Sequence, residues 1–99
     1  MADFALERLA GDRLRASGRL DFSTASQALQ TGIATIGLAG DQVVDLSGVT
    51  EGDSAGVAVL VEWVSAAVAA GVGLRYENVP PQMLAIARIS DLEDLLLRS

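Results

Sequence analysis

The sequence predicts one small α/β domain in which helices pack on a mixed four-stranded sheet. Segments with a period of two alternate along the chain with segments of helical spacing, in the order strand, strand, helix, strand, helix, strand, helix, helix. The chain has 99 residues, of which 51% are hydrophobic and only 4% aromatic. This length supports one aliphatic core, so we expect residues 1–99 to form a single domain.

The first two strands are predicted to form a hairpin. Phe4 and Leu6 alternate with polar neighbours, and Ala10-Gly11-Asp12 supplies a turn. From Leu14 to Leu20, apolar or small residues alternate with polar ones, which is typical of a half-buried strand. Its outer face carries three arginines, which we interpret as a solvated surface, with a second contact surface as the alternative: Arg13, Arg15 and Arg19.

The first helix follows that hairpin. Asp21-Phe22-Ser23 offers helix-capping groups, and the segment from Gly37 to Gly40 is expected to end the helix. Between them, six apolar or small residues follow the helical spacing: Ala25, Ala28, Leu29, Gly32, Ile33 and Ile36.

The middle of the chain predicts a buried strand and a long helix. Gln42 to Leu46 is almost unbroken apolar sequence, as expected for a strand covered on both faces. The helix is expected from about Ser54 to Ala70 and should end at Gly71.

The last elements are a strand and two short helices. The strand is predicted from Leu74 to Val79, and Pro80-Pro81 opens the next helix, because proline is tolerated in a first turn. Ser90-Asp91-Leu92-Glu93 matches a capping box, so a final helix is expected to turn three leucines inward: Leu92, Leu95 and Leu96.

Composition excludes several kinds of chemistry. The sequence has no cysteine and no histidine, which excludes disulfides, thiol catalysis, the usual zinc sites and histidine acid–base chemistry. The net charge is −6 and all seven basic residues are arginines. An acidic domain without a basic stripe is a poor candidate for nucleic acid or for an anionic membrane surface.

Catalytic and metal-binding alternatives are weak. Ser54 with Asp53 or Glu51 as its base is the best enzyme hypothesis, but neither carboxylate is a base of suitable type, so we expect no enzyme and no cofactor. Asp45 and Asp53 offer a metal pair without a third ligand. We favour instead that Asp45 braces the loop after it through backbone hydrogen bonds.

The pattern of hydropathy predicts a cytoplasmic protein that does not insert into a membrane. The start, Met1-Ala2-Asp3, lacks the basic and then apolar run of a signal peptide. The longest apolar stretch, Ala55 to Val72, is interrupted by Glu62 and Ser65 and is therefore not a membrane span.

The most informative stretch is Asp53-Ser54-Ala55-Gly56, where a strand passes into a helix. Ser54 is suited to cap that helix, because its oxygen can accept one of the unpaired N–H groups. Ala55 and Gly56 leave room for another surface to approach the backbone. This combination favours a docking site over an active site.

Two segments carry a family resemblance. Val43 to Thr50, with the sequence VVDLSGVT, and Asp53 to Val57, with the sequence DSAGV, resemble the signature of STAS domains. Three further segments are most similar to MlaB-like subunits of phospholipid-trafficking ABC transporters: Leu60-Val61-Glu62-Trp63, Asn78-Val79-Pro80 and Leu84 to Ile89. The chain departs from the family in having Gly52 where a bulky apolar residue often precedes the aspartate.

The resemblance implies a non-catalytic accessory STAS subunit. It would bind the ATPase of an ABC-type phospholipid transport system, and so lie in the cytoplasm at the inner membrane through that partner. The alternative that it implies is an anti-sigma factor antagonist, whose partners are a serine kinase and an anti-sigma factor. In that branch Ser54 would be the phosphoacceptor, whereas the residue pattern alone favours a helix cap and nothing more. We expect a monomer or a weakly associating protein.

The spacing in the long helix divides it into two faces. The face expected to enter the core consists of Val57, Leu60, Val61, Val64 and Val68. The opposite face consists of Ala55, Val59, Glu62, Trp63 and Ala66. We expect this face and the start of the helix to bind a partner. Trp63, the only tryptophan, is predicted to be an interface anchor. The alternative is that it lies over a neighbouring loop and completes the core.

Overall fold

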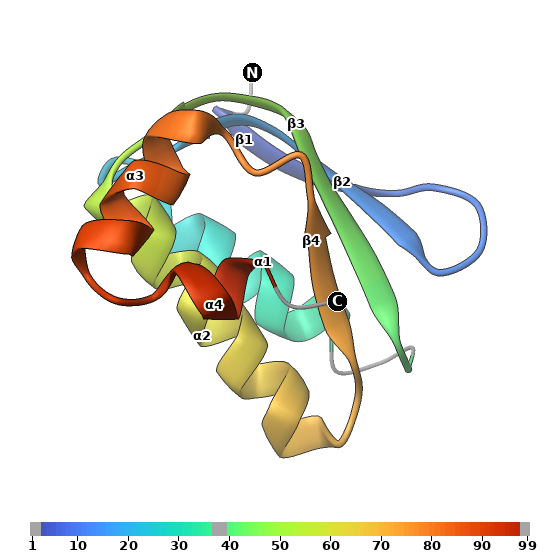
Figure 1. Cartoon of the computed structure of the whole chain (residues 1–99). Helices are drawn as coiled ribbons and strands as arrows, with labels where there is room; N and C mark the ends of the chain where they lie inside the picture. Colours follow the sequence, from blue (N-terminus) through green and yellow to red (C-terminus); the bar gives the residue numbers. More distant parts are fainter. Residues whose placement is uncertain (1–2, 37–39, 98–99) are drawn as a thin grey trace.

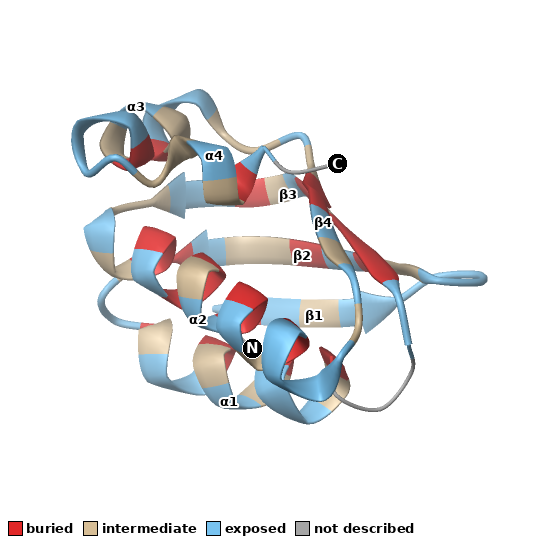
Figure 2. Cartoon of the chain, turned by 60° about the horizontal axis from the view of Figure 1, so that its bottom comes forward, coloured by how far each residue is buried: buried red, intermediate tan, exposed pale blue. Residues whose placement is uncertain are grey.

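Four strands form one mixed sheet in the computed structural model, which describes residues 3–36 and 40–97. The strands lie in the order β1-β2-β3-β4. Helices α1 (Ala25–Ile36) and α2 (Ser54–Ala70) lie side by side against one face of the sheet, as Figures 1 and 2 show. The predicted fold class is therefore confirmed.

The hairpin is present as predicted. β1 (Phe4–Arg8) pairs antiparallel with β2 (Arg13–Leu20), with Phe4 opposite Gly18. Gly11 takes a left-handed φ of 70° in the turn between them, a conformation that glycine adopts without steric cost.

The arginines of β2 lie on the outer face of the sheet, while its leucines are buried beneath the helices. Arg13 pairs with Glu77 across the sheet, and Arg19 pairs with both Asp21 and Glu51. The side chains of Arg13 and Arg19 are 40% and 45% exposed. This is the solvated outer face that the alternation predicts, and its ion pairs, which were not predicted, contribute little to stability.

β3 is longer than the apolar run predicts. It extends over Gln42–Gly52 because its second half pairs in parallel with β2 as far as Leu20 opposite Gly52. β4 (Leu74–Glu77) is shorter than predicted, since Asn78 takes a positive φ of 57° directly after it and interrupts the strand geometry.

α1 ends at Ile36, and the predicted stop from Gly37 to Gly40 falls largely on residues 37–39, outside the described residues. Ala28, Gly32 and Ile36 are buried. Ile33, which follows the same helical spacing as the buried residues, is nevertheless 45% exposed.

The C-terminal helices are α3 (Pro81–Ile89) and α4 (Glu93–Leu96), and α3 begins at the predicted prolines. The predicted capping box is wrong. Ser90 instead ends α3, where its N–H is bonded to the carbonyl of Ile86, and α4 begins after Leu92 without a side-chain cap. Leu96 is buried as expected, and two further leucines pack at the edge of the core: Leu92 and Leu95.

The core consists of apolar side chains from the sheet and all four helices, and its aromatic members are Phe4, Trp63 and Tyr76. In the described part of the chain, no helix combines the length and the apolar content needed to span a bilayer.

Candidate docking site

The cap of α2 is Asp53, and the prediction that Ser54 caps this helix is wrong. Asp53 has extended backbone angles, and its Oδ1 atom accepts a hydrogen bond of 3.0 Å from the Gly56 N–H. Ser54 is the first residue inside the helix, and its side chain is exposed. Asp53 is the N-cap because it lies one residue before the helix, where a side chain can reach an unpaired backbone N–H group.

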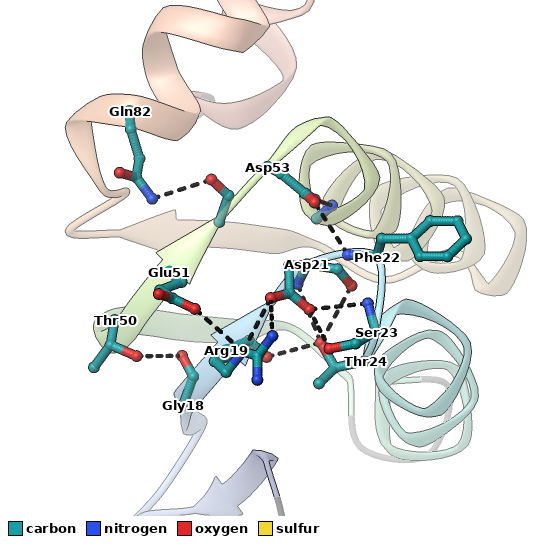
Figure 3. Close-up of polar contacts among 12 residues, drawn as sticks. Gly18, Arg19, Asp21, Phe22, Ser23, Thr24, Thr50, Glu51, Asp53 and Gln82 are labelled. Carbon is teal, nitrogen blue, oxygen red and sulfur yellow. Dashed lines mark hydrogen bonds and ion pairs between the residues drawn. The ribbon is translucent and has the colours of Figure 1, made fainter.

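The second oxygen of Asp53 reaches another part of the chain. Its Oδ2 atom accepts a hydrogen bond of 3.1 Å from the Phe22 N–H, which belongs to the turn before α1 (Figure 3). This one hydrogen bond, between residues 31 positions apart in the sequence, therefore joins the regions where α1 and α2 begin.

The turn that holds Phe22 is organised by its neighbours. Asp21 accepts hydrogen bonds from the Ser23 N–H and hydroxyl groups, at 3.0 Å and 2.7 Å. Thr24 donates its hydroxyl proton to the Arg19 carbonyl at 2.8 Å (Figure 3). The Ser23 hydroxyl and then Arg19 lower the pKa of Asp21 below its ordinary value, so this carboxylate stays ionised. Phe22 is thereby held at the surface, where it is 85% exposed.

An open groove of about 490 Å³ lies between the starts of α1 and α2. The described residues that line it are Phe22, Ala25, Ser26 and Leu29 from the α1 side, and Ala55, Ala58, Val59 and Glu62 from α2. The groove therefore brings together three of the predicted partner-facing residues: Ala55, Val59 and Glu62. It also contains Phe22, which the sequence reasoning missed, although an aromatic residue between Asp21 and Ser23 in a polar turn is an unusual signal.

The prediction that Trp63 faces outward is wrong. Trp63 is fully buried, and its Nε1 atom donates a hydrogen bond of 3.2 Å to the Ala28 carbonyl of α1. The indole lies against Gly32, where a Cβ atom would come within 2.1 Å of Nε1. Trp63 completes the core, as the alternative held, but it does so under a helix and not under a loop.

The two predicted faces of α2 are also partly wrong. Val59 is only 4% exposed and forms part of the groove floor, although it was assigned to the outer face. Val68, assigned to the core, is 63% exposed. The cause is that α2 contacts both the sheet and α1, so its buried arc is wider than one stripe and is rotated toward α1. Ala66 is half-buried and does not line the groove.

Gly56 serves the fold at the helix start. It is buried, and a Cβ atom at this position would lie 2.0 Å from the Leu20 carbonyl oxygen. Glycine is therefore required so that the first turn of α2 can approach the end of β2.

Asp45 accepts a backbone hydrogen bond as predicted, but the residues after it continue β3 and do not form the expected loop. Its Oδ1 atom accepts hydrogen bonds from the Ser47 N–H at 2.9 Å and from the Asn78 side chain at 3.0 Å. The bond from Asn78, followed by that from Ser47, lowers the pKa of Asp45. The described residues contain no group of three side chains that would hold a metal ion.

Comparison with known proteins identifies the kind of domain. A family model described as "Mlab, STAS domain" matches residues 6–98. A search of curated proteins found none that matches this chain.

Solved structures show the same fold. The Bacillus cell fate determinant SpoIIAA in its phosphorylated form is 19% identical, with a TM-score of 0.69 over 95% of this chain and 88% of that one. The anti-sigma factor antagonist SpoIIAA in its unphosphorylated form is also 19% identical, with a TM-score of 0.66 over 87% and 82%. A structure described as Mglu is 25% identical with a TM-score of 0.60, over 78% of this chain but only 20% of that chain.

Proposed function

The chain belongs to the MlaB-type STAS domain family, and from this premise we propose that it is a non-catalytic docking subunit. It binds the cytoplasmic ATPase of an ABC-type phospholipid transport system, supports the assembly or activity of that system, and lies at the inner membrane through this partner. The observation that carries the proposal is the apolar groove beside the start of α2, with the exposed ring of Phe22 at one end. An exposed aromatic ring beside a concave apolar surface is typical of a protein-binding site.

The hydrogen bonds around Ser54 favour docking over catalysis. Both oxygens of Asp53 accept backbone N–H groups, and the carboxylate of Glu51 pairs with Arg19. The contacts of both carboxylates are with groups other than the Ser54 hydroxyl. Neither group is therefore suited to activate the Ser54 hydroxyl.

The proposal predicts that Ala55→Arg weakens binding to the ATPase. An arginine at this half-buried position would project into the groove, so the affinity should fall at least about 10-fold, the equivalent of about 1.4 kcal/mol. Ala69→Arg is the matched control, because Ala69 is exposed on the same helix and does not line the groove. Affinity is measured by titration with the ATPase that co-purifies with the chain, and thermal melts show whether both variants fold.

Two results would contradict the proposal. One is that native purification recovers a serine kinase or an anti-sigma factor, and no ATPase. The other is that Ala55→Arg binds the ATPase as tightly as Ala69→Arg, which would place the interface elsewhere.

A second candidate function is a serine-phosphorylation partner switch. Ser54 is exposed in the first turn of α2, and the chain shares its fold with SpoIIAA, which has been solved in a phosphorylated and an unphosphorylated form. A phosphoryl group at a helix start is stabilised by the helix dipole, so the modification would leave this fold intact. It would also add roughly two negative charges beside the groove, which weakens contact with an apolar or acidic partner.

This candidate predicts different effects of two substitutions on binding. Ser54→Asp should weaken the complex with the ATPase more than Ser54→Ala, while Ser54→Asp keeps or slightly raises the thermal stability of the isolated domain. Titration and thermal melts of both variants provide the measurement, with mass spectrometry of native protein to detect phosphate on Ser54. Equal binding of the two variants and unmodified native Ser54 would remove the case for a switch.

A further inference from the structure

We propose that the groove between α1 and α2 binds an amphipathic helix of the partner, whose apolar stripe is flanked by a basic residue that pairs with Glu62. This inference rests on the proposed function and adds to it the chemistry of the segment that the partner presents.

The lining of the groove follows helical spacing on α2 and, in part, on the α1 side. On α2 the lining residues lie at relative positions 0, 3, 4 and 7: Ala55, Ala58, Val59 and Glu62. On the other side Ala25, Ser26 and Leu29 lie within α1, whereas Phe22 belongs to the turn before it. The α2 set spans about two helical turns, or roughly 10 Å along the axis. Each helix follows one of two parallel strands and packs on the same face of the sheet, so the two helices run side by side (Figure 2). Such a surface fits two turns of a third helix.

Half of the side chains that line the groove are small. Ala25 and Ser26 face the groove from α1, and Ala55 and Ala58 face it from α2. Small residues at a helix contact allow the axes to approach to about 8–10 Å, the usual distance for packed helices. Phe22 stands at the start of the groove, where Asp53 fixes its backbone N–H, so its exposed ring can contact a bound helix.

The charges around the groove favour a basic partner. Among the described residues that line it, Glu62 carries the only charge, and none of the described ion pairs involves Glu62. Asp21 and Asp53 flank the Phe22 end, where Arg19 already pairs with Asp21 and Glu51. A second copy of this chain, with a net charge of −6, would bring like charges together, and an anionic lipid surface would be repelled. A helix with an arginine or lysine beside its apolar stripe matches both the shape and the charge.

The test uses two synthetic helices of about 18 residues, a length at which an isolated helix becomes stable. Both carry the same leucine stripe, and they differ only in having arginine or glutamate beside it. Each is titrated into the full chain and followed by the backbone amide signals in nuclear magnetic resonance spectra. The arginine helix should bind at least about 10-fold more tightly than the glutamate helix, and should shift the signals of Phe22, Ala58 and Glu62.

Three variants sharpen this measurement. Glu62→Arg should reverse the preference, so that the glutamate helix binds more tightly, which a purely structural role of Glu62 would not produce. Ala58→Arg should weaken both helices at least about 10-fold, whereas Ala69→Arg should leave both unchanged. Equal affinity for the two helices, or signal shifts confined to residues outside the groove, would overturn the proposal.

Two further experiments test whether the groove binds something other than a partner helix. Sedimentation equilibrium that shows a dimer, dissociated by Ala58→Arg, would assign the groove to a second copy and overturn the proposal. Flotation with phosphatidylglycerol vesicles that is lost in Ala58→Arg would overturn it in favour of a lipid surface.

The two proposals fail in distinguishable ways. If Ala55→Arg weakens the ATPase complex but Ala58→Arg and Glu62→Arg do not, the proposed function stands and the helix-binding groove is overturned. If native purification yields no ATPase but the synthetic helices bind as expected, the groove is supported and only the identity of the partner is wrong.

Discussion

At the scale of single residues, the site depends on how the two oxygens of Asp53 are used. One oxygen caps α2 through Gly56, and the other accepts the Phe22 N–H from the turn before α1. A serine at the cap position has one side-chain oxygen, so it would be less suited to hold both groups at once. Asp53 therefore positions Phe22 and stabilises the helix, while the exposed Ser54 beside it remains accessible to modification.

Substitutions of Asp53 should separate these two roles. Asp53→Ala loses both hydrogen bonds and should lower the free energy of unfolding by about 1–2 kcal/mol. Asp53→Asn retains one carbonyl oxygen, which can still accept the Gly56 N–H, so it should lower the free energy of unfolding less than Asp53→Ala does. Amide hydrogen exchange at Phe22 should become faster than in the wild type. Ser54→Ala is the control and should change stability by less than about 0.5 kcal/mol, since Ser54 is exposed and is not the cap.

Urea denaturation and hydrogen exchange of the three variants provide the measurement. If Ser54→Ala lost more stability than Asp53→Ala, the assignment of the cap to Asp53 would be wrong.

At the scale of elements, the groove depends on how closely α1 and α2 pack. Trp63 of α2 lies against Gly32 of α1 and donates its hydrogen bond to Ala28. Its ring centroid is also 6.2 Å from that of Phe4 in β1. Trp63 thus joins α1, α2 and the sheet, and sets the spacing on which the floor of the groove depends.

The Gly32→Ala substitution tests this contact, because the close packing decides whether it raises or lowers the free energy of unfolding. In an open helical position, replacing glycine by alanine stabilises a protein by about 0.5–1 kcal/mol. Here the added Cβ would overlap the indole, so we expect a loss of about 1–3 kcal/mol instead. The loss should be smaller in a Trp63→Phe background, because the smaller ring leaves space.

Urea denaturation of the two single variants and the double variant measures these effects. Additive losses, or a gain in stability for Gly32→Ala, would show that the helices do not pack in this way. Trp63→Ala should cost about 3–5 kcal/mol of stability because it leaves a cavity in the core, so its effect on binding cannot identify an interface.

At the scale of the whole molecule, the ionisable side chains among the described residues lie at the surface or are partly exposed, except for Tyr76. Tyr76 is buried and donates a hydrogen bond of 2.6 Å to the Leu60 carbonyl, which ties β4 to α2. Burial raises the pKa of Tyr76 well above 10. The sequence contains one tyrosine, no cysteine and no histidine, and all seven basic residues are arginines. Between about pH 9 and 11, Tyr76 is therefore the only side chain expected to titrate.

The domain should lose stability in alkali through this residue. Because the folded state keeps Tyr76 protonated, its contribution is fully present below the unfolded pKa of about 10 and is lost as the pH rises above that value. Tyrosinate absorbance should then appear together with unfolding, followed by circular dichroism in the same titration. Tyr76→Phe should be about 1 kcal/mol less stable at neutral pH, from loss of the hydrogen bond, and insensitive to pH between about 9 and 11. Formation of tyrosinate near pH 10 with the fold intact would contradict this account.

Much of the architecture could be predicted from the residue pattern. The element order, the hairpin, the ends of α2 and the arginine-bearing outer face of the sheet all follow from alternation, helical spacing and turn residues, which are local properties of the chain. The stretch from Asp53 to Gly56 was recognised in the same way, because strand and helix signals meet there.

What local pattern could not determine was how the elements contact one another. Periodicity shows which residues of α2 share a side, but not that α1 covers a second side and buries Val59 and Trp63. Nor does spacing show that Asp53 reaches Phe22, since the two residues lie far apart in the sequence and meet only when the helices pack on the sheet. The sequence by itself determined the elements and their order. Only tertiary packing decided which faces are buried, and so formed the groove from two separate helix starts.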